Sequence, residues 1–128
     1  ITSLLDVWTG HAGVVSIHGP MAEGRLARGA DAYDRDGFLR VVTEPRPFGD
    51  VSTAGATVLA TGEATGVLRG GTLTQLAALA GTPWAFHADE PSILFLDDVN
   101  ERPYRLDRLI WQLEHSGALA SVTGIVFN

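Results

Sequence analysis

The stretch Ser92–Arg108, which reads SILFLDDVNERPYRLDR, decides the predicted fold. Its segment Ile93–Leu96 has no polar side chain, and so short an apolar run between turn residues is typical of a strand covered on both faces, as in a parallel sheet. Pro103 suits the first turn of a helix. After it, apolar side chains recur at the spacing of one helical face, at Leu106, Leu109, Ile110 and Leu113. The stretch predicts a strand, an acidic turn and an amphipathic helix.

Carboxyl groups follow directly where the predicted strand ends, at Asp97, Asp98 and Glu101. Ligand sites in open α/β sheets lie outside the carboxyl ends of the strands. A carboxylate there can orient a catalytic histidine, accept a proton, bind a metal or cap the next helix. On the pattern alone, capping and solvation are favoured over catalysis.

The N-terminal half of the chain gives weaker secondary-structure signals. An opening helix, ITSLLDVW, should end between Gly10 and Gly13, and a short buried strand, Val14–Ile17, should follow and stop at His18. Residues 22–50 contain many Gly and Pro residues and suggest a surface excursion or linker with one helix around Ala32–Val41.

The C-terminal half gives an alternation of strands and helices. Its expected elements are a hairpin of Thr57–Thr61 with Ala64–Leu68, a capping box at Thr72–Gln75 that opens a helix over Leu73–Ala80, the helix Pro103–His115 with Gly117 as C-cap, and a strand over Val122–Phe127. Strand, helix and strand in this order form a parallel crossover, so the predicted class is α/β.

Composition narrows the function. With 128 residues and 45% hydrophobic content the chain can bury a core, and its net charge of −6 argues against a nucleic-acid backbone or an anionic membrane as partner. The absence of cysteine excludes disulfides, thiolate catalysis and cysteine zinc sites. No apolar run reaches the roughly 20 residues of a membrane span. The chain starts at Ile1 and stops at Asn128 as if cut from a longer protein.

Other polar or glycine-rich positions have both a structural and a functional interpretation. Gly70-Gly71 could present N–H groups to an anion, but a turn that lets a helix pack close to a strand is favoured. His18 before Gly-Pro is more simply a strand-end histidine bonded to backbone. The four histidines show no metal-ligand spacing.

Three motifs taken together resemble the LD-carboxypeptidases, a serine peptidase family that includes muramoyltetrapeptide carboxypeptidase and the microcin C immunity proteins. The motifs are HGPM at 18–21, GVLRGGTL at 66–73 with GTP at 81–83, and LFLDDVNERPYRLDR at 94–108, and GIVF at 124–127 closes the pattern. Their order and spacing extend over nearly the whole chain.

The resemblance implies an N-terminal α/β domain, ending with its linker at residues 1–50, and the first part of a C-terminal swivelling β/β/α domain at residues 51–128. It also implies a Ser-Glu-His triad. The family serine stands just before an Asp-Ile-Thr, so it would precede Ile1, and the family histidine would follow Asn128. Residues 1–128 alone are therefore expected to be inactive.

The triad acid is the one member that the resemblance places in this chain. Relatives commonly carry Leu-Glu-Asp-Val, whereas this chain has Leu96-Asp97-Asp98-Val99. Glu101, the only glutamate of the turn, is the first choice for the acid. Asp97 is the alternative, if an aspartate stands in for the usual glutamate.

The implied reaction is hydrolysis of the L,D amide bond between meso-diaminopimelate and terminal D-alanine in cytosolic murein tetrapeptide, as in peptidoglycan recycling, without metal or other cofactor. Gly70, Gly71, Arg102, Arg105 and His18 are the residues expected to bind substrate. A cytoplasmic location is expected, and a homodimer is among the assemblies considered. The alternatives are an immunity-type enzyme that cleaves a peptidyl-nucleotide antibiotic and a non-catalytic binding domain of the same fold.

Overall fold

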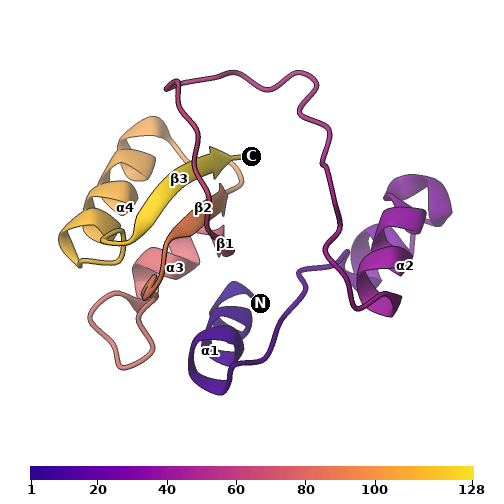
Figure 1. Cartoon of the computed structure of the whole chain (residues 1–128), viewed down its shortest axis with the longest axis horizontal. Helices are drawn as coiled ribbons and strands as arrows, with labels where there is room; N and C mark the ends of the chain where they lie inside the picture. The colour runs from indigo at the N-terminus through magenta and orange to yellow at the C-terminus, as the bar shows by residue number, and fades with distance from the viewer. The chain divides into compact units, whose positions relative to one another are not determined.

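The computed structural model describes every residue from Ile1 to Asn128, and the chain forms two compact units. Residues 1–16 and 62–128 make up the first unit, and residues 17–61 make up the second. The first unit contains α1 (Thr2–Ala12), β1 (Val67–Thr72), α3 (Leu73–Leu79), β2 (Ser92–Asp97), α4 (Pro103–His115) and β3 (Val122–Phe127) (Figure 1). The predicted domain boundary between residues 50 and 51 remains a prediction.

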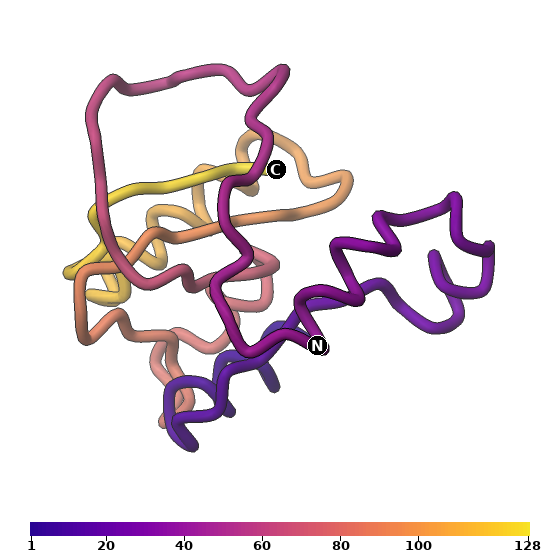
Figure 2. The backbone as a smooth tube through the Cα atoms, turned by 45° about the vertical axis from the view of Figure 1, so that its right-hand side comes forward, coloured from indigo at the N-terminus to yellow at the C-terminus, as the bar shows by residue number.

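The first unit is built on a three-stranded parallel sheet in the order β1-β2-β3. Helix α3 connects β1 to β2 and helix α4 connects β2 to β3. Figure 2 shows β2 and β3 running in the same direction. The structure confirms the α/β class and the parallel crossover, and α4 has the predicted bounds.

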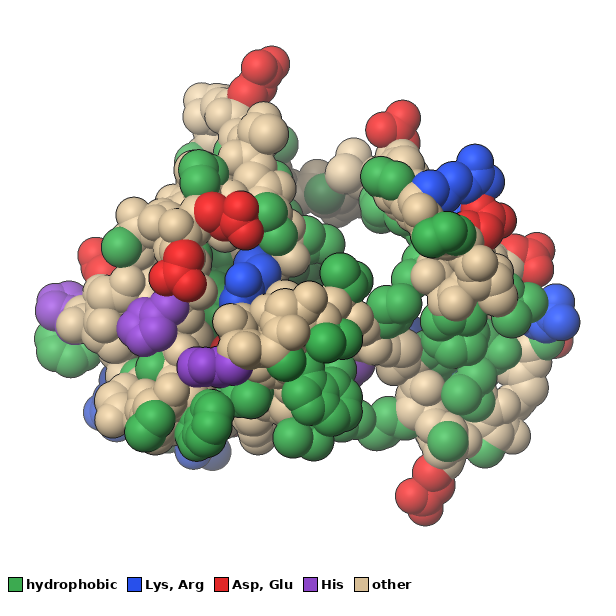
Figure 3. Space-filling model, turned by 60° about the horizontal axis from the view of Figure 1, so that its bottom comes forward, with side chains coloured by type: hydrophobic (Ala, Val, Ile, Leu, Met, Phe, Trp, Pro, Cys, Tyr) green, Lys and Arg blue, Asp and Glu red, His purple; other side chains and the backbone are tan.

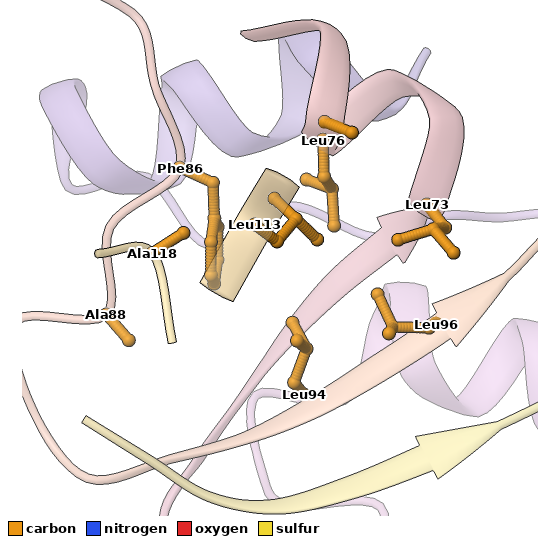
Figure 4. Close-up of a cluster of buried hydrophobic side chains, with 9 residues drawn as sticks. Leu73, Leu76, Phe86, Ala88, Leu94, Leu96, Leu113 and Ala118 are labelled. Carbon is orange, nitrogen blue, oxygen red and sulfur yellow. The ribbon is translucent and has the colours of Figure 1, made fainter. Parts of the chain in front are cut away.

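The hydrophobic core lies between the sheet and the two connecting helices. Leu94 and Leu96 alternate along β2 and are buried, and Figure 4 shows them extending toward Leu73, Leu76 and Leu113. The opposite face of β2 is less covered, since Phe95 is 36% exposed. The expectation of a strand covered on both faces is therefore wrong for the Phe95 face.

Both helices use the faces that the sequence predicts. Leu73, Leu76 and Ala77 of α3 are buried, and the apolar stripe of α4 packs on the same core. The Gln112 side-chain amide donates to the carbonyl oxygen of Ala77 at 2.8 Å and ties α4 to α3. None of the helices combines the length and apolar character that crossing a bilayer requires.

The predicted strand Val14–Ile17 is wrong. Helix α1 ends as expected at Gly13, which adopts a left-handed conformation with φ 63°. The chain beyond it folds back on α1, because the Ser16 hydroxyl bonds the Thr9 hydroxyl at 2.8 Å and the Leu5 carbonyl oxygen at 3.3 Å. These contacts leave residues 14–17 without a strand partner in the structure.

The predicted hairpin around residues 57–68 is also wrong. The chain is irregular up to Gly66, with Leu59 80% exposed, and β1 begins only at Val67. The alternation in this segment resembles a hairpin, but β1 pairs in parallel with β2 and with no segment next to it in sequence. A distant parallel partner leaves no local signal.

The second unit is helical. It contains the helical turns η1 (Ala22–Leu26) and η2 (Ala30–Ala32) and the helix α2 (Arg35–Thr43). The Asp34 side chain caps α2 by accepting from the Gly37 N–H at 2.9 Å. The predicted helix in this region is confirmed with a shift of a few residues.

Candidate active site

The N-terminus of α1 docks at the carboxyl end of β1 (Figure 1). Thr2 is buried, its hydroxyl oxygen accepts the Thr72 N–H, and its O–H donates to the Thr72 hydroxyl, both at 3.1 Å. The Ser3 hydroxyl donates to the Gln75 side-chain oxygen at 2.9 Å. Thr72 and Gln75 therefore bond α1 in place of the predicted capping box, which does not form.

Gly70 lets β1 lie close to β2, and Gly71 lets Thr2 of α1 approach β1 closely. Both glycines have positive φ values, 128° and 144°, which favour glycine. A Cβ atom on Gly70 would clash with the backbone oxygen of Phe95, and one on Gly71 would lie 2.7 Å from the methyl group of Thr2. The predicted turn is wrong, because both glycines lie within β1, but the expected close approach of a helix is confirmed at Gly71. A role for it in substrate binding remains a prediction.

Asp98 joins the acidic turn to the N-terminus of α3. One of its carboxylate oxygens accepts the Thr74 N–H at 2.9 Å and the Thr74 hydroxyl at 2.5 Å, and the other accepts the Val99 N–H at 2.9 Å. The N-cap of α4 is Arg102, without a side-chain hydrogen bond. The expectation that the acids cap the following helix is wrong, because Asp98 caps α3.

These bonds give stability that depends on pH. Partial burial raises the pKa of Asp98, but the Thr74 and Val99 donors and the charge of Arg105 outweigh burial, and the pKa lies below its ordinary value. A carboxyl group whose pKa is lower in the folded than in the unfolded protein stabilises the fold when the pH is above its unfolded-state pKa. This stabilisation is lost as the pH falls through the folded-state pKa.

Replacing Asp98 with asparagine should therefore cost about 1 kcal/mol of unfolding free energy at pH 7 and little at pH 3, since charged acceptors bond more strongly than neutral ones. Urea unfolding at both pH values measures the difference. An equal loss of unfolding free energy at pH 7 and pH 3 would contradict a stabilising role for the charged form of Asp98.

Asp97 and Glu101, the two acids considered for the triad, lie in different surroundings. Asp97 ends β2 in register with Thr72, and its Oδ1 atom is buried without a hydrogen-bond partner in the structure. Glu101 pairs with Arg105, with 2.6 Å between Oε2 and Nε. Glu101 already has a partner, whereas Asp97 has an unused buried acceptor beside the site where α1 docks.

The predicted substrate-binding residues are only partly brought together. Arg102 and Arg105 are exposed near the acidic turn, and Arg105 is already paired with Glu101. His18 is exposed in the second unit. Binding of substrate by His18 together with the other residues remains a prediction. The structure contains no group of three or more His, Asp or Glu side chains arranged to hold a metal ion.

Local sequence patterns did not predict the contacts that hold α1. Thr2, Ser3 and Asp6 are bonded to residues more than sixty positions away, at Thr72, Gln75 and Arg69. Local patterns assigned Thr72 and Gln75 to a cap and left Asp6 unassigned. A pairing across this separation could have been found only from related sequences.

Residues 65–128, which contain the sheet and the acidic turn, match the profile of the LD-carboxypeptidase C-terminal domain. The match covers half of the chain, and the chain belongs to the LD-carboxypeptidase family. The resemblance noted from the motifs is confirmed.

Similarity to individual relatives extends beyond this domain. A protein of Streptomyces coelicolor is 39% identical over 100% of this chain and 41% of its own length. The probable murein peptide carboxypeptidase of Bacillus subtilis is 30% identical over 91% of this chain and 36% of its own length. The crystal structure of muramoyltetrapeptide carboxypeptidase from Oxalobacter formigenes superposes with a TM-score of 0.74 at 31% identity, covering 98% of this chain and 42% of that one. The chain spans about two fifths of these relatives.

Proposed function

We propose that the complete protein is a serine-type LD-carboxypeptidase that removes the terminal D-alanine from murein tetrapeptide. The observation that carries the proposal is the docking of α1 beside Asp97 at one edge of the sheet, through the Thr2–Thr72 hydrogen bonds. Relatives named as murein peptide carboxypeptidases support the substrate class. The nucleophilic serine would precede Ile1 and the histidine would come from beyond Asn128.

Within this proposal the structure favours Asp97 over Glu101 as the triad acid. A buried carboxylate oxygen without a donor costs free energy that an imidazole N–H would recover. Glu101 would first have to give up Arg105. The shorter aspartate also stands at the position after Leu96 where relatives commonly carry glutamate.

The chemistry follows the serine-triad scheme. The histidine removes the proton from the serine oxygen, and this oxygen attacks the carbonyl carbon of the diaminopimelate residue. Asp97 accepts the other imidazole N–H, fixes the tautomer and stabilises the imidazolium. The histidine then protonates the departing D-alanine amine, and water releases the acyl group. Backbone N–H groups stabilise the oxyanion.

Substrate carboxylates need cationic or N–H partners. Arg102, which has no ion-pair partner in the structure, is the first choice for one of them, and Gly70, Gly71, Arg105 and His18 remain proposed contacts. A cytoplasmic location and assembly as a homodimer also remain predictions.

Incubation of the complete protein with murein tetrapeptide tests the function. The expected result is release of D-alanine in a reaction that a fluorophosphonate blocks. Cleavage of a peptidyl-nucleotide conjugate without D-alanine release would favour the immunity-type alternative, and binding without turnover would favour a non-catalytic domain. Residues 1–128 alone should hydrolyse neither substrate.

A further inference from the structure

A second polar contact holds α1 on the sheet, separate from the acidic turn. The carboxylate of Asp6 lies 3.5 Å from the guanidinium of Arg69 in β1, and both side chains are largely buried, at 7% and 14% exposure. Arg69 also lies over the ring of Phe86, with 5.7 Å between its Cζ atom and the ring centroid. Figure 3 shows histidine, acidic and basic side chains gathered on one face of the first unit.

This ion pair is a poor source of stability. It is a single long contact, and burial of two charges costs more than such a contact returns. Desolvation raises the pKa of Asp6, and the opposing charges of Arg69, His11 and His87 do not fully offset it. The ionised carboxylate is therefore less favourable in the folded protein than in water, and the pair is better explained by orientation than by stability.

The two polar contacts of α1 lie one helical turn apart. Thr2 bonds Thr72 at the carboxyl end of β1, and Asp6 bonds Arg69 three residues earlier in the strand. Gly10, one further turn along α1, also lies beside the guanidinium, since a Cβ atom there would be in van der Waals contact, 3.4 Å from the Arg69 Nη2 atom. Two points along an axis fix both the position and the rotation of a helix. A slip by one turn would move α1 by about 5.4 Å.

We propose that Asp6 and Arg69 are positioning residues that fix the register of α1 on β1, and through it the placement of the serine before α1 relative to Asp97. This inference rests on the proposed function, in which α1 carries the nucleophile at its start. Displacement of a reacting group by about 1 Å can lower the rate about 100-fold. Both side chains are largely buried, so neither is proposed as a substrate contact.

The double variant Asp6→Leu with Arg69→Met separates positioning from stability. Two apolar side chains of similar volume should leave the melting temperature unchanged or higher. The expected kcat for D-alanine release falls at least about tenfold, with KM within about twofold, because substrate binding is retained. The matched control is Glu44→Gln with Arg46→Gln, which removes an exposed ion pair of the second unit and should change neither constant.

A wild-type kcat in a folded double variant would overturn the inference. If the double variant does not fold, the nearly isosteric Asp6→Asn serves instead, and a wild-type kcat there has the same meaning. Should wild-type protein release no D-alanine, the proposed function fails, and amide hydrogen exchange of α1 then decides the inference. Exchange of the α1 amides at least about tenfold faster in the double variant supports it, and unchanged exchange contradicts it.

Discussion

Replacing Asp97 with asparagine in the complete protein is expected to lower kcat for D-alanine release by about 10³- to 10⁴-fold and to leave the fold intact. The amide is nearly isosteric with the carboxylate, but it neither carries the charge that stabilises the imidazolium nor holds the required tautomer. Steady-state kinetics with murein tetrapeptide measure the loss, and circular dichroism checks the fold.

Glu101→Gln is the matched control, because Glu101 lies in the same turn and pairs with Arg105. Its expected effect on kcat is within about threefold, because the Arg105 side chain of the pair is half-exposed and solvent screens such a pair. The opposite ranking, with the large loss in Glu101→Gln, would return the triad role to Glu101.

Replacing Gly70 with alanine is expected to destabilise the first unit by about 3 kcal/mol or more. The new methyl group would meet the backbone oxygen of Phe95 in the neighbouring strand, which cannot move without breaking the pairing of β1 with β2. Urea unfolding of the complete protein, followed by far-UV circular dichroism, gives the loss of unfolding free energy.

Gly81→Ala controls for backbone strain alone. Gly81 also has a positive φ, 81°, but no atom lies within 4 Å of an added Cβ. The expected loss is about 1 kcal/mol. Equal losses in the two glycine variants would show that the contact with Phe95 does not matter.

Local sequence signals were sufficient for the elements in which propensity and packing agree. The apolar run of β2, the Pro103 start and helical stripe of α4, and the apolar residues of β3 each point to the element that the structure contains. The family resemblance depends on these segments together with the motifs at 18–21, 66–73 and 81–83, and the family is confirmed by the profile match over residues 65–128.

The failures occur where side-chain contacts that form only in the folded chain decide the structure. Val14–Ile17 has the composition of a strand, but Ser16 bonds back to α1. The capping box at Thr72–Gln75 has the right residues, yet their side chains bond Thr2 and Ser3, and Asp98 supplies the cap of α3. In each case the polar side chains have more than one possible partner, and the partner that they use is determined only in the folded chain.

The acidic turn shows the same limit on a smaller scale. The sequence places Asp97, Asp98 and Glu101 within five positions and gives no basis for separating their roles. In the structure the three acids have different surroundings. The buried Asp97 oxygen has no hydrogen-bond partner, Asp98 accepts a hydrogen bond from Thr74, and Glu101 forms an ion pair with Arg105. These neighbours, which depend on tertiary packing, favour Asp97 as the acid of the proposed triad.

Proton NMR of the complete protein, directed at the hydrogen-bonded imidazole N–H of the proposed triad histidine, tests the role of Asp97 most directly. If Asp97 is the triad acid, a strongly downfield N–H signal is expected in the wild type and in Glu101→Gln, and it is expected to disappear in Asp97→Asn. A signal that persists in Asp97→Asn and disappears in Glu101→Gln would contradict this role of Asp97.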